Sequence, residues 1–451
     1  MSGYAEYREV NLPWLKAVPA HWEIRRNKNI FTEQKEIVGE RSADYTLLSL
    51  TLNGIIPRDM DGGGKFPESF DKYKIVKNGD MAFCLFDIDE TPRTVGLSGY
   101  NGMLTGAYTI MRVSNINARF IYYYYLALDN GKMLRPLYTG LRKTININTF
   151  QSTKVPVPPR EEQDQIVRFL DWKISSINKL INIKKKEIKA IDALKRSTVS
   201  HAITRGLTAD APMKYSGVKW LGDIPQRWYT VPLYAIAQVK SINNCIDLPL
   251  MSVYLDAGVV PFVEREEKRT NATSKDLTNY QRVDPGDFVL NNQQAWRGSV
   301  GVSFHSGIVS PAYIVLSLNN TLDSHYANYL FRSRCMVDQY LVISRGVGSI
   351  QRNLYWSALK RVVVPIPSKK EQMEIVEYLD GLNNKFDATI KKLTEEVAVL
   401  EEYKNKIIAD TVTGKIDVRG IEIPEYEFVD EDIDNADENP EQGADEPPEE
   451  E

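Results

Sequence analysis

The side chains of this sequence best suited to chemistry are amides and guanidinium groups, not catalytic bases. Residues 291–298 read Asn-Asn-Gln-Gln-Ala-Trp-Arg-Gly and follow a strand-like run, so four amides, an indole and a guanidinium share one loop. Arg, Asn and Gln side chains can pair bidentately with the edges of nucleic-acid bases. Any one of them alone is better explained as an ordinary solvated loop residue, and only the set favours a binding role.

No arrangement typical of an enzyme active site is found in the sequence. The four histidines stand apart, and no HxxxH or HExxH pair indicates a metal site. The run 62–65 (Gly-Gly-Gly-Lys) is followed by Phe66 where a Walker loop needs Ser or Thr. The three cysteines form no CxxC pair, which favours reduced thiols in the cytoplasm over disulfides or a zinc site. We therefore predict no metal site and no cofactor bound by this chain.

The chain contains an internal repeat, which predicts a second site at the place equivalent to the amide-rich loop. Trp14-Leu15-x-x-x-Pro19-x-x-Trp22 returns as Trp220-Leu221-x-x-x-Pro225-x-x-Trp228 at an offset of 206. Residues 155–171 match residues 364–380 at nine of seventeen positions without a gap, at an offset of 209. Duplication with divergence predicts a pseudo-two-fold molecule that meets paired partners and two related targets.

Each repeat consists of a globular part and a long helix. Short β-type runs alternate with turns such as Lys77-Asn78-Gly79-Asp80 and Asp284-Pro285-Gly286-Asp287, which indicates α+β domains. Proline-rich stops precede both helical stretches. The predicted division is a first recognition domain (1–158), a first long helix (159–210), a second recognition domain (211–367), a second long helix (368–416) and a tail (417–451).

The two helical stretches, residues 160–203 and 369–412, carry a narrow apolar seam. Apolar residues recur at alternating steps of three and four, the spacing of a heptad repeat. The seam positions are Ile177, Ile181, Ile188, Ile191 and Lys195 in the first helix, and Phe386, Ile390, Leu393, Val397, Leu400 and Lys404 in the second. The matched lysines fix register at some cost in stability. We predict an antiparallel intramolecular coiled coil; separate packing of each helix on its own globular part is the alternative.

Polar and basic residues recur at equivalent places in both halves, but the two halves differ in chemistry. The place of the amide-rich loop is taken in the first half by residues 87–93 (Asp-Ile-Asp-Glu-Thr-Pro-Arg). Basic side chains elsewhere suit phosphate contacts, which position a protein without reading sequence. The candidate nucleic-acid contacts are Arg58, Lys65, Arg93, Arg142, Lys143, Asn146, Arg265, Lys268, Arg269, Asn291, Asn292, Gln293, Gln294, Trp296, Arg297, Arg345, Arg352 and Asn353.

The formal net charge of −4 hides a basic body. Residues 421–451 hold fifteen Asp and Glu and no Lys or Arg, which leaves 56 basic and 45 acidic residues in residues 1–420. A net charge of +11 suits a polyanion binder, although many other proteins reach it. The acidic tail lacks the apolar content that folding needs, so we predict that it is disordered.

These features together resemble the specificity subunit of type I restriction–modification enzymes over residues 12–416. The likeness is carried by Trp220-Leu221-Gly222-x-Ile224-Pro225-x-x-Trp228, Gly286-Asp287-x-Val289-Leu290-Asn291, Ala295-Trp296-x-Gly298-Ser299-x-Gly301, Gly307-Ile308-Val309-Ser310-Pro311-Ala312-Tyr313, Pro365-Ile366-Pro367-x-x-x-Glu371-Gln372 and the heptad helices. The first half departs from this pattern, with Leu104-Thr105-Gly106-Ala107-Tyr108 where the second half has residues 309–313. Its contact residues are therefore less well defined.

The resemblance implies a non-catalytic subunit in a methyltransferase and restriction endonuclease complex. Each globular part would be a target recognition domain that reads half of a split sequence in double-stranded DNA. The helices would set the gap between the half-sites. Two modification subunits, which bind S-adenosylmethionine and methylate adenine, would dock on this frame, and two motor–nuclease subunits could join them. No membrane contact is expected.

Two other classes of protein stay open at this point. A coiled-coil adaptor that scaffolds proteins without reading DNA would explain the helices but not the aligned polar loops. An enzyme with an unrecognised motif would turn over a nucleotide or a methyl donor as an isolated chain. Protection of a defined DNA sequence by the complex separates a specificity subunit from both.

Overall fold

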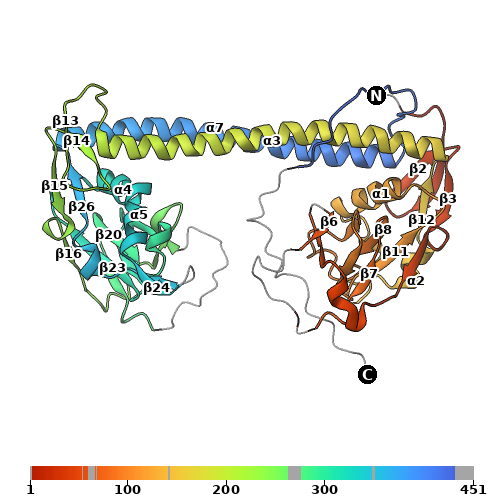
Figure 1. The fold of residues 1–451 in the computed structure, drawn as a ribbon, viewed down its shortest axis with the longest axis horizontal. Coiled ribbons are helices and arrows are strands. Elements are labelled where there is room, and N and C mark those ends of the chain that lie inside the picture. Colours follow the sequence, from red (N-terminus) through yellow and green to blue (C-terminus); the bar gives the residue numbers. More distant parts are fainter. Residues whose placement is uncertain are drawn as a thin grey trace. The chain divides into compact units, whose positions relative to one another are not determined.

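The structure is a computed structural model that describes residues 3–431 except 53, 59–66, 68, 141–142, 263–275 and 348–350. The chain separates into two compact units: unit 1 comprises Met1–Lys186 and Leu393–Glu451, and unit 2 comprises Glu187–Lys392. Each unit contains one globular domain and about half of each long helix (Figure 1). The expected α+β class with two repeated domains and two long helices is confirmed.

Unit 1 is built around a four-stranded antiparallel sheet in the order β4-β11-β8-β9. Its strands are β1 (Tyr7–Leu12), β2 (Leu15–Pro19), β3 (Glu23–Arg26), β4 (Phe31–Gln34), β5 (Leu48–Thr51), β6 (Gly54–Pro57), β7 (Lys74–Val76), β8 (Asp80–Phe83), β9 (Val95–Leu97), β10 (Gly102–Leu104), β11 (Thr109–Val113) and β12 (Lys154–Val157). Its short helices are α1 (Ala118–Asn130) and α2 (Ile147–Ser152). Strand β8 is buried along its whole length, as a central strand covered on both faces must be.

Unit 2 repeats this plan with a sheet in the order β16-β23-β20-β21. Its strands are β13 (Met213–Tyr215), β14 (Asp223–Pro225), β15 (Tyr229–Pro232), β16 (Ala237–Val239), β17 (Met251–Tyr254), β18 (Gly258–Pro261), β19 (Gln281–Val283), β20 (Asp287–Asn291), β21 (Val300–Val302), β22 (Gly307–Val309), β23 (Tyr313–Leu318), β24 (Arg345–Val347), β25 (Gln351–Asn353) and β26 (Val363–Ile366). Its short helices are α4 (Ser324–Arg332), α5 (Arg334–Ile343) and α6 (Trp356–Leu359). The repeat seen in the sequence is therefore a repeat of topology.

The Glu-Gln pair after each proline-rich stop joins a long helix to its own domain. The Gln163 side chain donates to the carbonyl of Pro158 (2.8 Å) and accepts from the backbone N–H of Asn117 (2.8 Å), the N-cap of α1. In unit 2, Gln372 makes the same two contacts, with Pro367 (3.0 Å) and with Asp323 (2.7 Å), the N-cap of α4. One buried amide thus orients two helices, which explains why this motif survives in both halves.

In each unit, the Trp-containing motif packs against the C-terminal end of a long helix, α7 in unit 1 and α3 in unit 2. Gly414 follows α7 with a φ of +76°, and a Cβ there would lie 2.4 Å from Pro19 Cδ and 3.2 Å from the Trp22 ring. Gly206 follows α3 with a φ of +75° and lies against Trp228 in unit 2. Glycine is strongly favoured where the backbone has a positive φ and a neighbouring side chain occupies the space of a Cβ. Both long helices therefore end in the same way, at a glycine packed against the Trp-containing motif.

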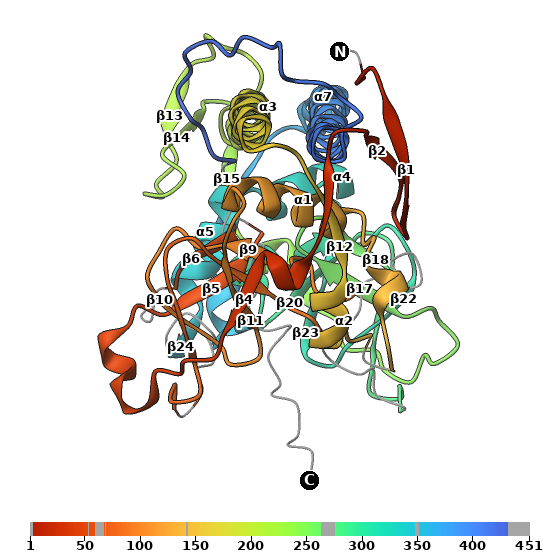
Figure 2. The same ribbon diagram turned by 90° about the vertical axis from the view of Figure 1, so that its right-hand side faces the viewer.

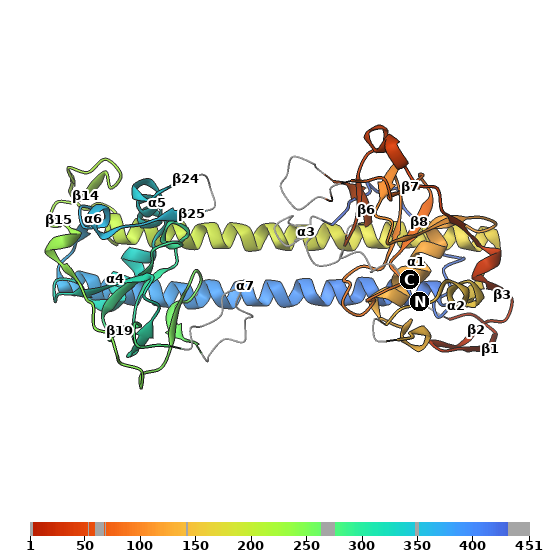
Figure 3. The same ribbon diagram turned by 90° about the horizontal axis from the view of Figure 1, so that it is seen from below.

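The two long helices, α3 (Arg160–Arg205) and α7 (Lys369–Val412), pack together and run antiparallel in each unit (Figure 3). In unit 1, Lys184 forms an ion pair with Glu396; in unit 2, Lys195 Nζ lies 2.5 Å from Asp387. Every predicted seam residue is buried or half-buried. Both helices also enter the domain cores, through Ile166 and Leu170 of α3 and Ile375 and Leu379 of α7, so the two arrangements considered for the helices occur together.

The acidic tail is not disordered from its start. Residues 418–431, here called the C-terminal strap, leave α7 and lie along α3 in unit 1 (Figure 2). The prediction of disorder from residue 417 is wrong for residues 417–431, because polar side chains of α3 bind the strap backbone and Val418 is fully buried. Residues 432–451 lie outside the described residues.

Candidate nucleic-acid interface

The amide-rich loop of unit 2 connects two central strands, β20 and β21. The carbonyl of Ser299 accepts from the N–H of Asn291 (3.0 Å), so the loop closes on itself directly after β20. A one-turn 3-10 helix, Ala295–Arg297, follows, and Gly298 with a φ of 110° returns the chain to β21. Ala295 is buried against the core, whereas Gln293 and Arg297 are exposed. The sheet therefore holds a short, firmly anchored loop with its longest polar side chains in solvent.

The aromatic and basic residues of this loop support one another. Trp296 donates its indole N–H to the carbonyl of Gln293 (2.9 Å), and the Arg297 guanidinium lies 4.6 Å from the centre of the Trp296 ring. Stacking on an aromatic ring orients a guanidinium without removing its five donors. Arg297 is thus held in position while its hydrogen-bonding groups stay available.

A second predicted group lies beside this loop. The N–H of Leu354 donates to the carbonyl of Asn292 (2.9 Å), which brings the end of β25 to the loop. Strand β25 pairs with β24, and Arg345 lies opposite Asn353. Arg352 is half-buried and Arg345 is exposed. Within the part of the chain that the structure describes, Arg297, Arg345 and Arg352 have no carboxylate partner.

The equivalent place in unit 1 has the same backbone frame with a different surface. The N–H of Ile145 donates to the carbonyl of Leu85 (2.8 Å), the counterpart of the bond between Leu354 and Asn292. The unit 1 loop, however, is closed by ion pairs. Asp89 binds Arg135 (3.1 Å) and Lys143 (3.3 Å), and Lys143 also reaches Glu90 at 2.7 Å.

The ion pairs shift the titration of this loop. The hydrogen bonds that Lys143 donates to Glu90 and Asp89 raise the pKa of Lys143. Desolvation acts to raise the pKa of Asp89, but the hydrogen bonds and charges of Arg135 and Lys143 together outweigh it, so the pKa lies below the usual value. Both groups are therefore charged at neutral pH, and the loop is a paired, nearly neutral surface.

Arg93 is also engaged within its own domain. Its guanidinium binds Asp129 (3.1 Å) and the side chain of Asn130 (2.7 Å). Asp129 is only 2% exposed and also accepts from the backbone and hydroxyl of Thr94 and from Lys132. A carboxylate this deeply buried needs these donors. Arg93 therefore has a structural task that its sequence position did not reveal.

The remaining candidates in the first half are placed as follows. Asn146 is the N-cap of α2 and accepts from the N–H of Asn148 (2.8 Å). Arg58 is half-buried, and its backbone donates to Leu47 (2.9 Å). Lys65, Arg142, Arg265, Lys268 and Arg269 lie outside the described residues.

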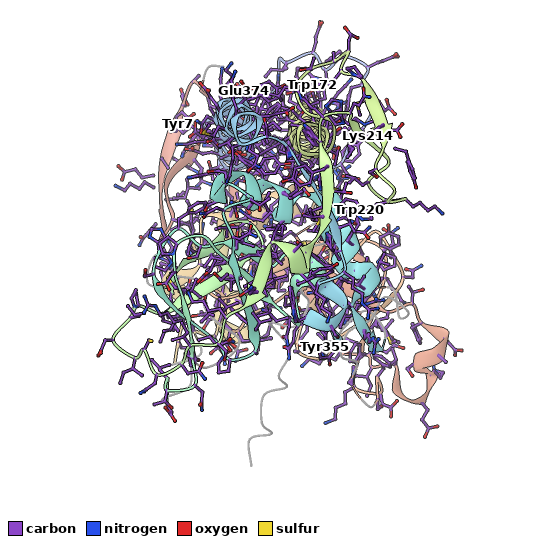
Figure 4. The ribbon with its side chains drawn as sticks, turned by 90° about the vertical axis from the view of Figure 1, so that its left-hand side faces the viewer. Tyr7, Trp172, Lys214, Trp220, Tyr355 and Glu374 are labelled. Carbon is purple, nitrogen blue, oxygen red and sulfur yellow. The ribbon has the colours of Figure 1, made fainter. Side chains whose placement is uncertain are left out.

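Sequence reasoning missed two features near these loops. Tyr355, exposed to 50%, directly follows the Leu354 contact and lies on the side of the unit 2 domain that faces away from α7 (Figure 4). A hollow of about 630 Å³ on the same domain is lined by Tyr234, Trp356, Lys360 and Arg361, among others. A second hollow of about 460 Å³, in unit 1, is lined by Leu137 and by polar residues of α2 and its C-terminal end. In the sequence, the spacing of Trp356, Lys360 and Arg361 was the feature that could have indicated the hollow in unit 2.

Among the described residues, no group of three or more His, Cys, Asp or Glu is placed to hold a metal ion. No helix in that part of the chain combines the length and the apolar content that crossing a membrane requires.

Both repeats match one family of known proteins. Residues 70–190 and 225–399 match the family described as type I restriction modification DNA specificity domain. The MjaVIII type I restriction enzyme specificity subunit of Methanocaldococcus jannaschii is 24% identical over 441 residues, which cover 92% of this chain and 98% of the relative. A putative MjaX specificity subunit of the same organism is 25% identical over 428 residues, covering 89% and 95%.

A solved structure shows the same fold. It is a chain from a study of complex assembly and conformational transition in a type I R-M system, with a TM-score of 0.59 and 14% identity. The match covers 88% of this chain and 99% of that chain.

Proposed function

This chain belongs to the family of type I restriction modification DNA specificity domains, and we propose that it reads a bipartite sequence in double-stranded DNA. It is a non-catalytic DNA specificity subunit of a type I restriction–modification system. The observation that supports bipartite reading is the pair of topologically equivalent loops, after β8 and after β20, whose surfaces differ. Two unlike reading surfaces on one repeated frame fit a target with two unlike halves.

In the proposed unit 2 interface, base reading belongs to the amide-rich loop. Asn291, Gln293 and Gln294 can pair with adenine, and Arg297 can bind the O6 and N7 acceptors of guanine in the major groove. Asn292 belongs to the same proposed interface, but its Oδ1 is buried, so a bidentate pair requires its side chain to turn outward. Arg345 and Arg352 suit phosphate oxygens, since phosphate contacts fix register without reading sequence. Trp296 positions Arg297 and makes no base contact in this proposal, because its N–H is already used.

In the proposed unit 1 interface, the ion-paired loop is a scaffold. Lys143, Arg93 and Asn146 each have an intramolecular role, so reading in this half falls to residues that those groups support. The recognition domains are assigned to residues 1–158 and 211–367. The helices between and after them are assigned the role of a spacer, which sets the number of unread base pairs.

The chemistry of the complex belongs to partner subunits in this proposal. Two modification subunits dock on the helical frame, carry S-adenosylmethionine and methylate adenine, and two motor–nuclease subunits can join them. The three cysteines are free thiols, which suits the cytoplasm.

A domain exchange tests bipartite reading. Residues 211–367 are replaced by the second recognition domain of a relative with a different target, and methylated adenines are mapped across a genome. We expect one half-site to change and the other to stay.

Lengthening α3 and α7 together by whole turns should lengthen the gap between half-sites. A complex that protects no defined DNA sequence would show an adaptor instead.

A further inference from the structure

The C-terminal strap is held mainly through its backbone. Gln165 donates to the carbonyls of Val418 (3.1 Å) and Ile421 (2.8 Å). Ser175 donates to the carbonyl of Glu427 and accepts from the N–H of Val429, both at 2.9 Å. The side chains of Asn178 and Asn182 donate to the carbonyls of Val429 (3.2 Å) and Asp430 (2.9 Å). One face of α3 therefore binds an extended segment as a peptide groove would.

The strap buries this polar face of α3. Ser175, Asn178 and Asn182 are 2%, 5% and 7% exposed, although Ser and Asn on a long helix usually face water. Their hydrogen-bonding groups are satisfied by the strap, so the burial costs little. The burial of this face is thus a property of the strap and not of the helix pair alone.

The equivalent face of α7 in unit 2 is exposed among the residues that the structure describes. At the repeat offset of 209, Ser175, Asn178 and Asn182 correspond to Asn384, Asp387 and Lys391, all exposed. Gln165 corresponds to Glu374, which lies on the side of α7 away from α4 and is also exposed (Figure 4). The sequence repeat thus supplies two helix faces at equivalent positions, and the described part of the chain covers only one of them.

The strap ends in an ion-paired clasp. Glu431 binds Lys185 at 2.8 Å and also Lys404, the polar residue of the predicted seam. Lys404 additionally donates to Asn178 (3.3 Å). Among the described residues, Glu422, Glu425, Glu427 and Asp430 of the strap form no ion pair. Neutralisation of lysines by the acidic residues of the strap therefore contributes little to holding the strap on α3. This favours a strap that covers a protein-binding face.

We propose that the C-terminal strap occupies the docking face for one of the two modification subunits and must leave before that subunit binds. The inference rests on the proposed docking of two modification subunits on the helical frame. The strap suits displacement because no strand ladder holds it: side-chain contacts with α3 and one clasp can be released in turn. The uncovered face of α7 then accepts the first subunit, and the strap-covered face of α3 accepts the second.

Stepwise titration with the modification subunit of the same restriction system, read by native mass spectrometry, tests this order of binding. Three chains are compared: the full chain, a chain that ends at Glu431, and a chain that ends at Ile423. The last keeps Val418, Ile421 and Ile423, which pack in the core, and loses the contacts to Ser175, Asn178, Asn182 and Lys185. We expect the second copy to bind at least about tenfold more weakly than the first on the two longer chains, and equally on the shortest.

A cross-link keeps the test independent of truncation. Asn178→Cys with Val429→Cys should fix the strap when oxidised and stop binding at one copy, and reduction should restore two. Equal affinity of both copies for the full chain, or weaker binding to the shortest chain, overturns the inference and leaves the proposed docking intact. Binding of no copy by any chain overturns both. A gain in affinity for random duplex DNA alone would assign the strap to DNA screening and also overturn the inference.

Discussion

The loops after β8 and β20 occupy the same place in two copies of one fold, yet their charges are arranged in opposite ways. The bond from Ile145 to Leu85 in unit 1 and that from Leu354 to Asn292 in unit 2 show that the backbone frame is shared. In unit 1 the basic side chains are paired with acids of the same domain. In unit 2 the guanidinium of Arg297 is stacked and exposed.

This difference separates two ways of using arginine and lysine. A basic side chain paired with a buried carboxylate stabilises the domain, and moving it to a ligand would leave an uncompensated charge. A basic side chain stacked on an aromatic ring is oriented but keeps its donors for a ligand. Both kinds of residue look alike in the sequence. Their substitution should therefore give different results, in stability for unit 1 and in specificity for unit 2.

The largest expected effect is on stability, from Arg93→Ala. Asp129 keeps Thr94 and Lys132 but loses a guanidinium, so the free energy of unfolding should fall by about 2–4 kcal/mol. Denaturant unfolding of the isolated chain measures this free energy. The base preferences of the methylation sites should stay the same. A change in preference without loss of stability would place Arg93 at the DNA and remove the contrast between the halves.

Arg297→Ala should give the converse result. Loss of a bidentate contact to guanine should cost about 1–3 kcal/mol in discrimination, which is about 5–150-fold, at one base pair of one half-site. Binding of the complex to a set of single-base variants of the target measures this. Stability should change little, because Arg297 is exposed. Gln293→Ala is a matched control in the same loop, with an effect on a different base pair.

Much of the architecture could be predicted from the sequence because it is encoded locally. The seam residues, the Pro-x-Pro stops and the repeated Glu-Gln pair determine helices and junctions through spacing alone. The shared position of the two loops follows from the repeat. The amide-rich loop could be recognised because its residues are contiguous.

The pairings in unit 1 could not be predicted because their partners are distant in sequence. Arg93 meets Asp129 only after β9 and α1 are packed, and Lys143 meets Asp89 across the loop that precedes α2. The strap was missed for a related reason. Its composition predicts disorder, whereas its order comes from the Ser, Asn and Gln side chains of a helix about 250 residues away in sequence, as the bond from Asn178 to Val429 shows. Composition describes what a segment can do alone, not what another element supplies.

A smaller difference between the two halves should appear in the salt dependence of DNA binding. Arg345→Ala should weaken binding to all sequences alike and reduce the slope of log K against log salt concentration by about 1, if it contacts one phosphate. Lys143→Ala in unit 1 is the matched control, and the slope should stay unchanged because that lysine is already neutralised by Asp89 and Glu90. Equal slopes for both variants would show that the ion pairs of unit 1 open on DNA, and the contrast between the loops would fail.

The smallest effect concerns the titration of Asp89. Desolvation raises its pKa, but the hydrogen bonds and charges of Arg135 and Lys143 together outweigh that effect, so the pKa lies below the usual value. A carboxyl with a depressed folded pKa adds stability above its unfolded pKa and loses it as the pH falls through the folded value. The pair should therefore be intact at neutral pH and open only in acid, below about pH 4. NMR titration of the carboxyl carbon should show the Asp89 pKa rising in Lys143→Met, while that of Asp417, lowered by Arg419, stays constant. An unchanged Asp89 would mean that Lys143 is not bound there in solution and is available to the duplex, as Arg297 is in the other half.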